Sequence, residues 1–485
     1  MTDSTAAKKD LTQGGIFSTL LRLALPIAAT EFIQMLYNLA DMFWMGRLGS
    51  DALAATGTAG LFLWLSVGLM LIGKVGTEIG VSQARGRGDV RQAFDYARMG
   101  LYISVILGLF YGSFMLFFRK PLVGLFSFQE KQVADDMAAY MGIMAIGVPF
   151  SFVSAAIGGS FSASGNTRIP FLINSIGMAV NLLLDPVFIF VLGLGVRGAA
   201  MTSIMAQIGV TVVLLIAVKT SRNRPFDQYS FFDGPIKRIS LRQAWKDMRI
   251  GFTGQIFRWT LPIFLESTLF CLLTMVTTRF EVSFGAYAVA MSRVGSQVES
   301  LSWMVGAGFG SALTVFVGQN YGANQIERIR DSVRYATFLM VSWGLFVTAI
   351  LALGGGIIFS VFLPDPGLRD LGVTYLRIIA VCQIPMNLEG VFGNAFKGKG
   401  RTVPASLCSI TSNIIRVPLA FLLSKTSLGL LGIWIAVSLT ACLRGIWIAV
   451  WYIAAERRKR KDGVLAKPGV QGEGERNEKE ETSFF

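Results

Sequence analysis

The sequence predicts an all-α polytopic membrane protein with twelve transmembrane helices in two pseudo-symmetric six-helix lobes. Hydrophobic residues make up 53% of the 485 residues and charged residues only 15%, whereas soluble proteins carry about a quarter charged residues. The apolar residues form twelve continuous runs, and each run approaches or exceeds the roughly 20 residues that a helix needs to cross a bilayer. Several residues of the first half also recur in the second half.

Six of the predicted spans lie in each half of the chain, and continuous rather than alternating apolar residues favour helices over a β-barrel. The spans of the first half are 17–46, 53–80, 92–118, 134–159, 169–192 and 198–219. The spans of the second half are 251–279, 287–316, 333–361, 371–394, 404–424 and 429–453.

The repeat joins residues at a constant interval of 236 positions. Its members are Arg22, Pro26, Gly49, Gln83, Gly86, Asp95 and Arg98, which recur as Arg258, Pro262, Gly285, Gln319, Gly322, Asp331 and Arg334. Internal repeats of half the chain length, in very apolar segments, are typical of secondary transporters. Six spans return the chain to its starting side, so we expect two lobes of equal orientation that can rock against each other.

These spans divide the chain into five parts. We expect a cytoplasmic N-terminal segment at 1–15, an N-lobe at 16–219, a cytoplasmic linker at 220–250, a C-lobe at 251–455 and a disordered cytoplasmic tail at 456–485. The linker is polar and contains proline, and the chain from Val464 onward is rich in Gly, Glu and Lys.

The net charge of +14 is distributed asymmetrically. Basic residues gather in the loops between spans two and three and between spans six and seven, and after the last span, whereas the opposite loops are nearly bare. The positive-inside rule therefore predicts a multi-pass protein of the cell inner (plasma) membrane with both termini in the cytoplasm. This placement argues for membrane lipid and against nucleic acid as a partner.

Composition also excludes several kinds of chemistry. The chain has no histidine, and its four cysteines all lie in predicted spans without disulfide or metal-site spacing. We therefore expect no cofactor and no enzymatic activity.

Two aspartates distinguish the halves. Asp41 corresponds to Thr277 and Asp185 corresponds to Val417, so only the first half keeps this carboxylate pair. A charge at mid-bilayer costs roughly 2.5–3.5 kcal/mol on insertion scales, which indicates that both carboxylates have a use or a partner. Both lie one to two helical turns before the outer loops, so we expect them at similar depth.

Other polar residues accompany the pair. Gln34, Tyr37, Asn38 and Asp41 form one helical face, Asn181 and Asp185 are an i, i+4 pair, and Thr202 and Ser203 open the sixth span. Their oxygens could bind Na+, most directly at Asp41, Asn181 and Asp185. Alternatively, one carboxyl could carry a proton, or the polar groups could simply join helices.

Three further residues stand out. Pro26 interrupts the hydrogen bonding of the first span, and we interpret it as a hinge. Glu266 and Glu389 could form a second-half cation or substrate site, although either could pair with Arg258 or Arg377.

At these residues the chain resembles the MATE family of multidrug and toxic compound extrusion antiporters. The segments ALPIAATEFIQMLYNLADMFWMGRLG at 24–49 and NLLLDPVFIFVLGLGVRGAA at 181–200 are similar to its first and fifth spans. The turns at Gln83–Gly86 and Gln319–Gly322 are similar to conserved family loops, and the likeness covers about residues 16–455. The aspartate pair is most similar to the DinF-like branch.

The resemblance implies cation-coupled export of amphipathic, often cationic drugs and toxins by a rocker-switch motion, coupled to Na+ or H+. The family's first-lobe cation site falls on Asp41, Asn181 and Asp185. Ser203 stands where relatives place a threonine hydroxyl, and Thr202 adjoins it. Positions that line the cavity fall on Tyr37, Asn38 and Tyr140. Glu266 resembles the second-lobe glutamate of the NorM branch, whose tenth-span aspartate aligns with Met386, one turn before Glu389. We expect a monomer.

Two rival functions are also compatible with paired intramembrane aspartates. A lipid-linked precursor flippase of the same superfamily would need a cationic cavity, whereas the intramembrane arginines lie mostly near helix ends. An intramembrane aspartyl protease would also use two aspartates, but the GxGD pattern of those enzymes is missing, because Asp185 follows LLL.

Overall fold

The computed structural model describes residues 11–126, 130–220, 250–362 and 366–461. The first half forms α1 (Ile16–Leu48), α2 (Ser50–Gly86), α3 (Val90–Gly124), α4 (Lys131–Ala163), α5 (Arg168–Pro186), a π-helix η1 (Val187–Val191) and α6 (Gly195–Thr220). The second half forms α8 (Ile250–Val282), α9 (Ala286–Gly322), α10 (Ile326–Phe362), α11 (Pro366–Ala380), α12 (Gln383–Gly398), α13 (Val403–Ser424) and α14 (Leu430–Lys461). The predicted linker at 220–250 lies almost wholly outside the described residues, as does most of the predicted tail at 456–485.

Twelve spans of the described chain are long and apolar enough to cross a membrane, which confirms the predicted fold class. The tenth span differs in construction from the prediction of one helix, because α11 ends at Ala380 and α12 begins at Gln383. Pro385 lies in the first turn of α12, where a missing backbone N–H costs no helical hydrogen bond. The protein is therefore a multi-pass, all-α membrane protein.

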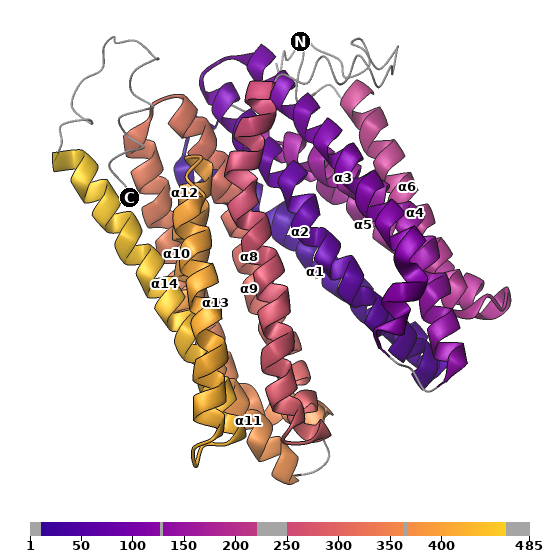
Figure 1. Ribbon diagram of the computed structural model, residues 1–485. Coiled ribbons are helices and arrows are strands. Elements are labelled where there is room, and N and C mark those ends of the chain that lie inside the picture. Colours follow the sequence, from indigo (N-terminus) through magenta and orange to yellow (C-terminus); the bar gives the residue numbers. More distant parts are fainter. Residues whose placement is uncertain (1–10, 127–129, 221–249, 363–365, 462–485) are drawn as a thin grey trace, which may run out of the picture.

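The helices are arranged as two bundles (Figure 1). Helices α1 to α6 form the first lobe and α8 to α14 the second, and the two lobes diverge toward the end opposite the chain termini. Each lobe has its own buried apolar core. A further core joins α1 to α9 and α12, so the lobes are packed together near the termini.

The backbone repeats with the sequence. Left-handed backbone conformations occur at equivalent places in both lobes, in the pairs Gly49 and Gly285, Gly88 and Asn324, Gly165 and Gly400, and Gly195 and Gly429. A positive φ is uncommon outside glycine and marks a defined turn. The same turns at the same positions confirm that the lobes are two copies of one helical unit.

The lobes are joined by a symmetric pair of hydrogen bonds at the end that holds the termini, which we name the closed end. The side-chain amide of Gln83 donates to the carbonyl of Gly398 at 2.9 Å, and that of Gln319 donates to the carbonyl of Ala163 at 2.7 Å. Gln83 and Gln319 are equivalent in the repeat, and both side chains are buried. Each lobe therefore donates one hydrogen bond to the other from an equivalent glutamine.

Two glycines allow this approach. A Cβ atom on Gly86 would overlap the backbone carbonyl of Gln319, and one on Gly322 would overlap that of Gln83. Leu11, which precedes α1, adds two hydrogen bonds to α9 of the second lobe. Its N–H donates to Gln319 Oε1 at 3.3 Å, and its carbonyl accepts from Asn320 Nδ2 at 3.2 Å. The closed end is thus a close backbone-to-backbone contact between the lobes.

Candidate ion and substrate site in the first lobe

Asp185 lies at a local change of helix type. It is the penultimate residue of α5, and Pro186 and the π-helix η1 follow it. Proline has no N–H to donate into the helix, and the next turn is wider, with the N–H of Leu192 donating to the carbonyl of Val187 at 2.9 Å. Single π-turns of this kind occur frequently at functional sites. This π-helix was not predicted from the sequence.

Asp185 is enclosed by polar partners. Its side chain and that of Asn181 are each 1% exposed, and Thr202 is fully buried. The hydroxyl of Thr202 donates to Asp185 Oδ1, and Asn181 Nδ2 donates to the same oxygen at 3.3 Å. Neither bond involves the second carboxylate oxygen, Asp185 Oδ2.

Asp41, from α1, is the second acid of this site. It lies close enough to Asp185 for direct electrostatic interaction, and Tyr37 and Tyr140 lie within range of both carboxylates. The hydroxyls of Tyr37 and Ser203 share a hydrogen bond of 2.9 Å, which joins α1 to α6. The structure therefore brings together the residues predicted from three separate spans.

Two buried oxygens of the site accept no hydrogen bond from any described residue. They are Asn181 Oδ1 and Asp185 Oδ2. A buried acceptor without a donor is costly unless water or an ion satisfies it. Carboxylate, amide and hydroxyl oxygens are hard donors, and they suit a small cation. The residues present thus fit Na+, and they equally fit a proton on one carboxyl.

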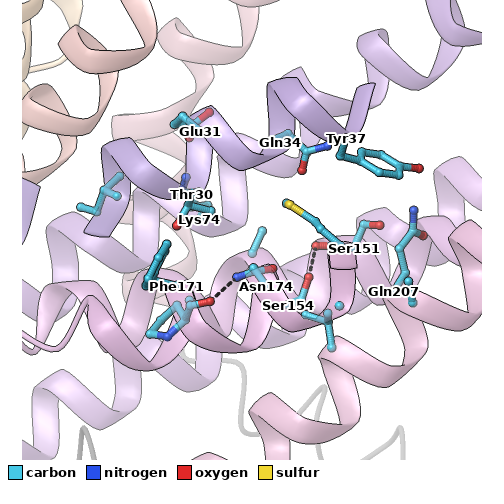
Figure 2. Close-up of a pocket in the computed structure, with 18 of the residues that line it drawn as sticks. Thr30, Glu31, Gln34, Tyr37, Lys74, Ser151, Ser154, Phe171, Asn174 and Gln207 are labelled. Carbon is cyan, nitrogen blue, oxygen red and sulfur yellow. Dashed lines mark hydrogen bonds between the residues drawn. The ribbon is translucent and has the colours of Figure 1, made fainter. Parts of the chain in front are cut away.

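A cavity of about 340 Å³ lies beside the acidic pair, between α1, α2, α4, α5 and α6 (Figure 2). Its lining is amphipathic: apolar side chains supply the larger part of the surface, and hydroxyls and carboxamides from four of these helices also face the space. Its charged residues are Glu31 and Lys74. Tyr37, Asn181 and Ser203, which surround the acidic pair, also line the cavity.

The residues predicted to line the cavity do not all do so. Gln34 and Tyr37 line the cavity. Asn38 is exposed and accepts a hydrogen bond from Gln34 at 3.2 Å, outside the lining. Tyr140 is buried near the acids. Pro26 lies within α1, which continues through it as one helix, so its role as a hinge stays a prediction.

Glu266 and Glu389 belong to the second lobe, away from this cavity. Ser406 Oγ donates to Glu266 Oε2 at 2.8 Å. Glu389 forms an ion pair with Arg444, and the atoms Oε2 and Nε are 2.6 Å apart. The partner of Glu389 is therefore Arg444 on α14 rather than Arg258 or Arg377.

Several cavity residues were not identified from the sequence as a site. They are Lys74, Ser151, Ser154, Asn174 and Gln207. Ser151 and Ser154 have helical i, i+3 spacing, which places them on one face. Lone hydroxyls and amides in membrane helices more often join helices, so this spacing alone did not indicate a cavity.

Comparison with known proteins agrees with this architecture. The MatE family model matches residues 26–187 and 262–422. The probable multidrug resistance protein NorM of Thermotoga maritima is 23% identical, with 93% of this chain and 95% of that protein aligned. A protein of Shewanella oneidensis named FAD transporter is 24% identical, with 90% and 93% aligned.

One solved structure is especially informative about shape. It shows the outward-facing conformation of a multidrug resistance MATE family transporter of the MOP superfamily. It superposes with a TM-score of 0.82 at 22% identity and covers 96% of this chain and all of that chain. At this identity the likeness establishes the fold.

Proposed function

This chain belongs to the MatE family of multidrug efflux transporters, and from that premise we propose that it is a secondary antiporter coupled to Na+ or H+. It is a transporter of small molecules and not an enzyme. The proposed cargo is amphipathic and often cationic drugs and toxins. The proposed coupling site is the pair Asp41 and Asp185 with Asn181, Thr202 and Ser203.

One observation carries this proposal. Tyr37, Asn181 and Ser203 border both the cavity and the acidic pair. A substrate in the cavity would therefore contact the same side chains that hold the carboxylates in place. Antiport requires that ion and substrate exclude each other or favour opposite-facing states, and a shared wall provides such a link.

The closed end supports alternating access by a rocker switch. Among the described residues the lobes meet there through a shared apolar core, two buried hydrogen bonds and two close glycine contacts, so this end is one compact interface that would have to separate as a unit. Basic residues Arg85 and Arg87 lie beside Gln83 in the sequence, and by the positive-inside rule this end faces the cytoplasm. The described state is then outward-facing, in a monomer of the inner membrane with both termini cytoplasmic.

The energetics permit this coupling. Export against a hundredfold gradient costs about 2.8 kcal/mol, because each tenfold step costs about 1.4 kcal/mol. One cation that enters down a potential of about 100 mV supplies roughly 2.3 kcal/mol before its own concentration gradient is added. A single Na+ or proton per cycle is therefore nearly sufficient.

The charged residues of the cavity support a second candidate cargo. Lys74 and Glu31 give the lining one positive and one negative group. A lysine at this position suits a carboxylate or phosphate on the substrate, and one relative is named FAD transporter. Export of an anionic, flavin-like amphiphile is thus the alternative. A flippase for lipid-linked precursors would need a more strongly cationic cavity.

Transport in proteoliposomes tests the proposal. Sodium and proton gradients are imposed separately, and uptake of a fluorescent organic cation and of FAD is followed. We expect one of the two gradients to drive transport, and Asp41→Asn and Asp185→Asn to abolish it. Asp135→Asn, an isosteric change of an exposed residue at the start of α4, is the matched control. Equal transport by parent and Asp185→Asn would reject the coupling role.

A further inference from the structure

The repeat places charged residues of the second lobe where the first lobe has its cavity. Four residues from four helices line the cavity of the first lobe: Thr30, Ser154, Asn174 and Val210. By the repeat intervals of their helices, their equivalents in the second lobe are Glu266, Glu389, Ser406 and Arg444. Neutral side chains around a space are thus replaced by two acids, a hydroxyl and a guanidinium.

These second-lobe residues contact one another. The guanidinium of Arg444 forms the 2.6 Å ion pair with Glu389, between α14 and α12. Ser406, from α13, donates to Glu266 of α8. Glu266 lies within electrostatic range of Glu389, so the two carboxylates share one local site. Lys397 and Arg416 also lie within electrostatic range of Glu389, but Arg444 is the cation that forms the ion pair with it. The side chains of Arg444 and Glu389 are only 13% and 23% exposed.

Two neighbouring carboxylates inside the membrane-spanning part of a protein need a cation or a proton to balance their charge. Arginine supplies a permanent positive charge, because it does not lose its proton in proteins. Since Arg444 belongs to the same lobe as its partner, its effective concentration at Glu389 is on the order of millimolar or more. A dissolved ion would have to displace this tethered group in every transport cycle.

We propose that Arg444 is a built-in counter-cation for Glu266 and Glu389, so that this lobe takes no coupling ion from solution. Ion exchange is then confined to the lobe that holds Asp41 and Asp185. Removal of the guanidinium would leave Glu266 and Glu389 facing a vacated space, and it would create a site for Na+. The inference deepens the proposed function by fixing which lobe exchanges ions.

The test measures cation binding to the purified full-length protein in detergent. All variants carry Asp41→Asn and Asp185→Asn, so that the first-lobe carboxylates contribute nothing. Binding of radioactive sodium and the Na+-dependent rise in melting temperature are measured at alkaline pH, with choline as the reference cation. The parent of this series is compared with Glu389→Gln, Arg444→Leu, Arg444→Lys and the double variant Arg444→Leu with Glu389→Gln.

We expect saturable sodium binding only after the charge of Arg444 is removed. Its affinity should exceed that of the parent and of Arg444→Lys by at least about tenfold, or about 1.4 kcal/mol. The gain should vanish in the double variant. If Arg444→Leu does not fold, Arg444→Gln keeps hydrogen-bonding atoms without the charge and takes its place.

Two results would overturn the inference. One is a folded charge-removal variant that binds no more sodium than the parent. The other is sodium binding by the parent that Glu389→Gln abolishes. Because the first-lobe acids are neutralised throughout, neither result depends on whether that lobe couples transport. Failure of the proposed function itself would appear separately, as proteoliposome transport that ignores both gradients.

Discussion

The paired glutamines at the closed end give a quantitative prediction about alternating access. In the described state Gln83 and Gln319 are 6% and 3% exposed, and each donates one hydrogen bond across the lobe boundary. The double variant Gln83→Ala with Gln319→Ala removes both donors. The carbonyls of Gly398 and Ala163 then lose these bonds whenever this end is closed.

The size of the effect follows from the cost of leaving buried polar groups unpaired. Each such group costs about 1–3 kcal/mol in the closed conformation. In the open conformation both carbonyls reach water, and the cost disappears there. The double variant should therefore shift the equilibrium toward opening of this end by about 2–6 kcal/mol, or roughly 30-fold to 20,000-fold. Because the two glutamines are equivalent in the repeat, the two single variants should contribute similar shares of this free-energy change.

Distance measurements between spin labels on the two lobes, placed near the closed end, report this equilibrium directly. We expect the short distance to dominate in the parent and a longer distance to dominate in the double variant. Gln132→Ala, a change of an exposed glutamine on α4, should leave the parent distribution unchanged. An unaltered distribution in the double variant would refute the role of the hydrogen bonds in holding this end shut.

Three further variants test the closed end and the cavity. Gly86→Ala adds a Cβ that overlaps the carbonyl of Gln319, so the spin-label distance should lengthen and transport should fall. Gly60→Ala, where a Cβ meets nothing within 4 Å, should preserve both, and equal behaviour of the two variants would contradict the packing argument. In the cavity, Lys74→Ala should raise KM for an anionic substrate roughly 10- to 150-fold, because a hydrogen bond to a charged group contributes about 1.5–3 kcal/mol. Glu31→Gln should likewise raise KM for an organic cation. Unchanged KM values in initial-rate assays would exclude these contacts.

Much of the fold could be predicted because it is recorded in local composition and in the repeat. Apolar runs fix which segments span the membrane, and the constant interval fixes the relation between the lobes. The same comparison isolated Asp41 and Asp185, whose equivalents Thr277 and Val417 are neutral. Their equal depth in the first and fifth spans, together with the family resemblance, led to the prediction that the two acids share one site.

Other features depend on tertiary packing and could not be predicted. The contact of Arg444 with Glu389 depends on the relative register of α14 and α12, which no local spacing encodes. The cavity arises because the helices around Ser154 and Asn174 leave a space, whereas the same residues could equally join helices. The π-helix after Pro186 likewise reflects packing around a proline that straight helices also tolerate.

The most direct test of the central account is whether a bound substrate expels the coupling cation from the first lobe. A fluorescent organic cation is added to purified protein in weakly buffered detergent solution, while a sodium electrode and a pH indicator record what is released. The account predicts stoichiometric release of Na+ or of protons by the parent and none by the variant Asp41→Asn with Asp185→Asn. Substrate binding without release of either ion, or equal release by that variant, would contradict it.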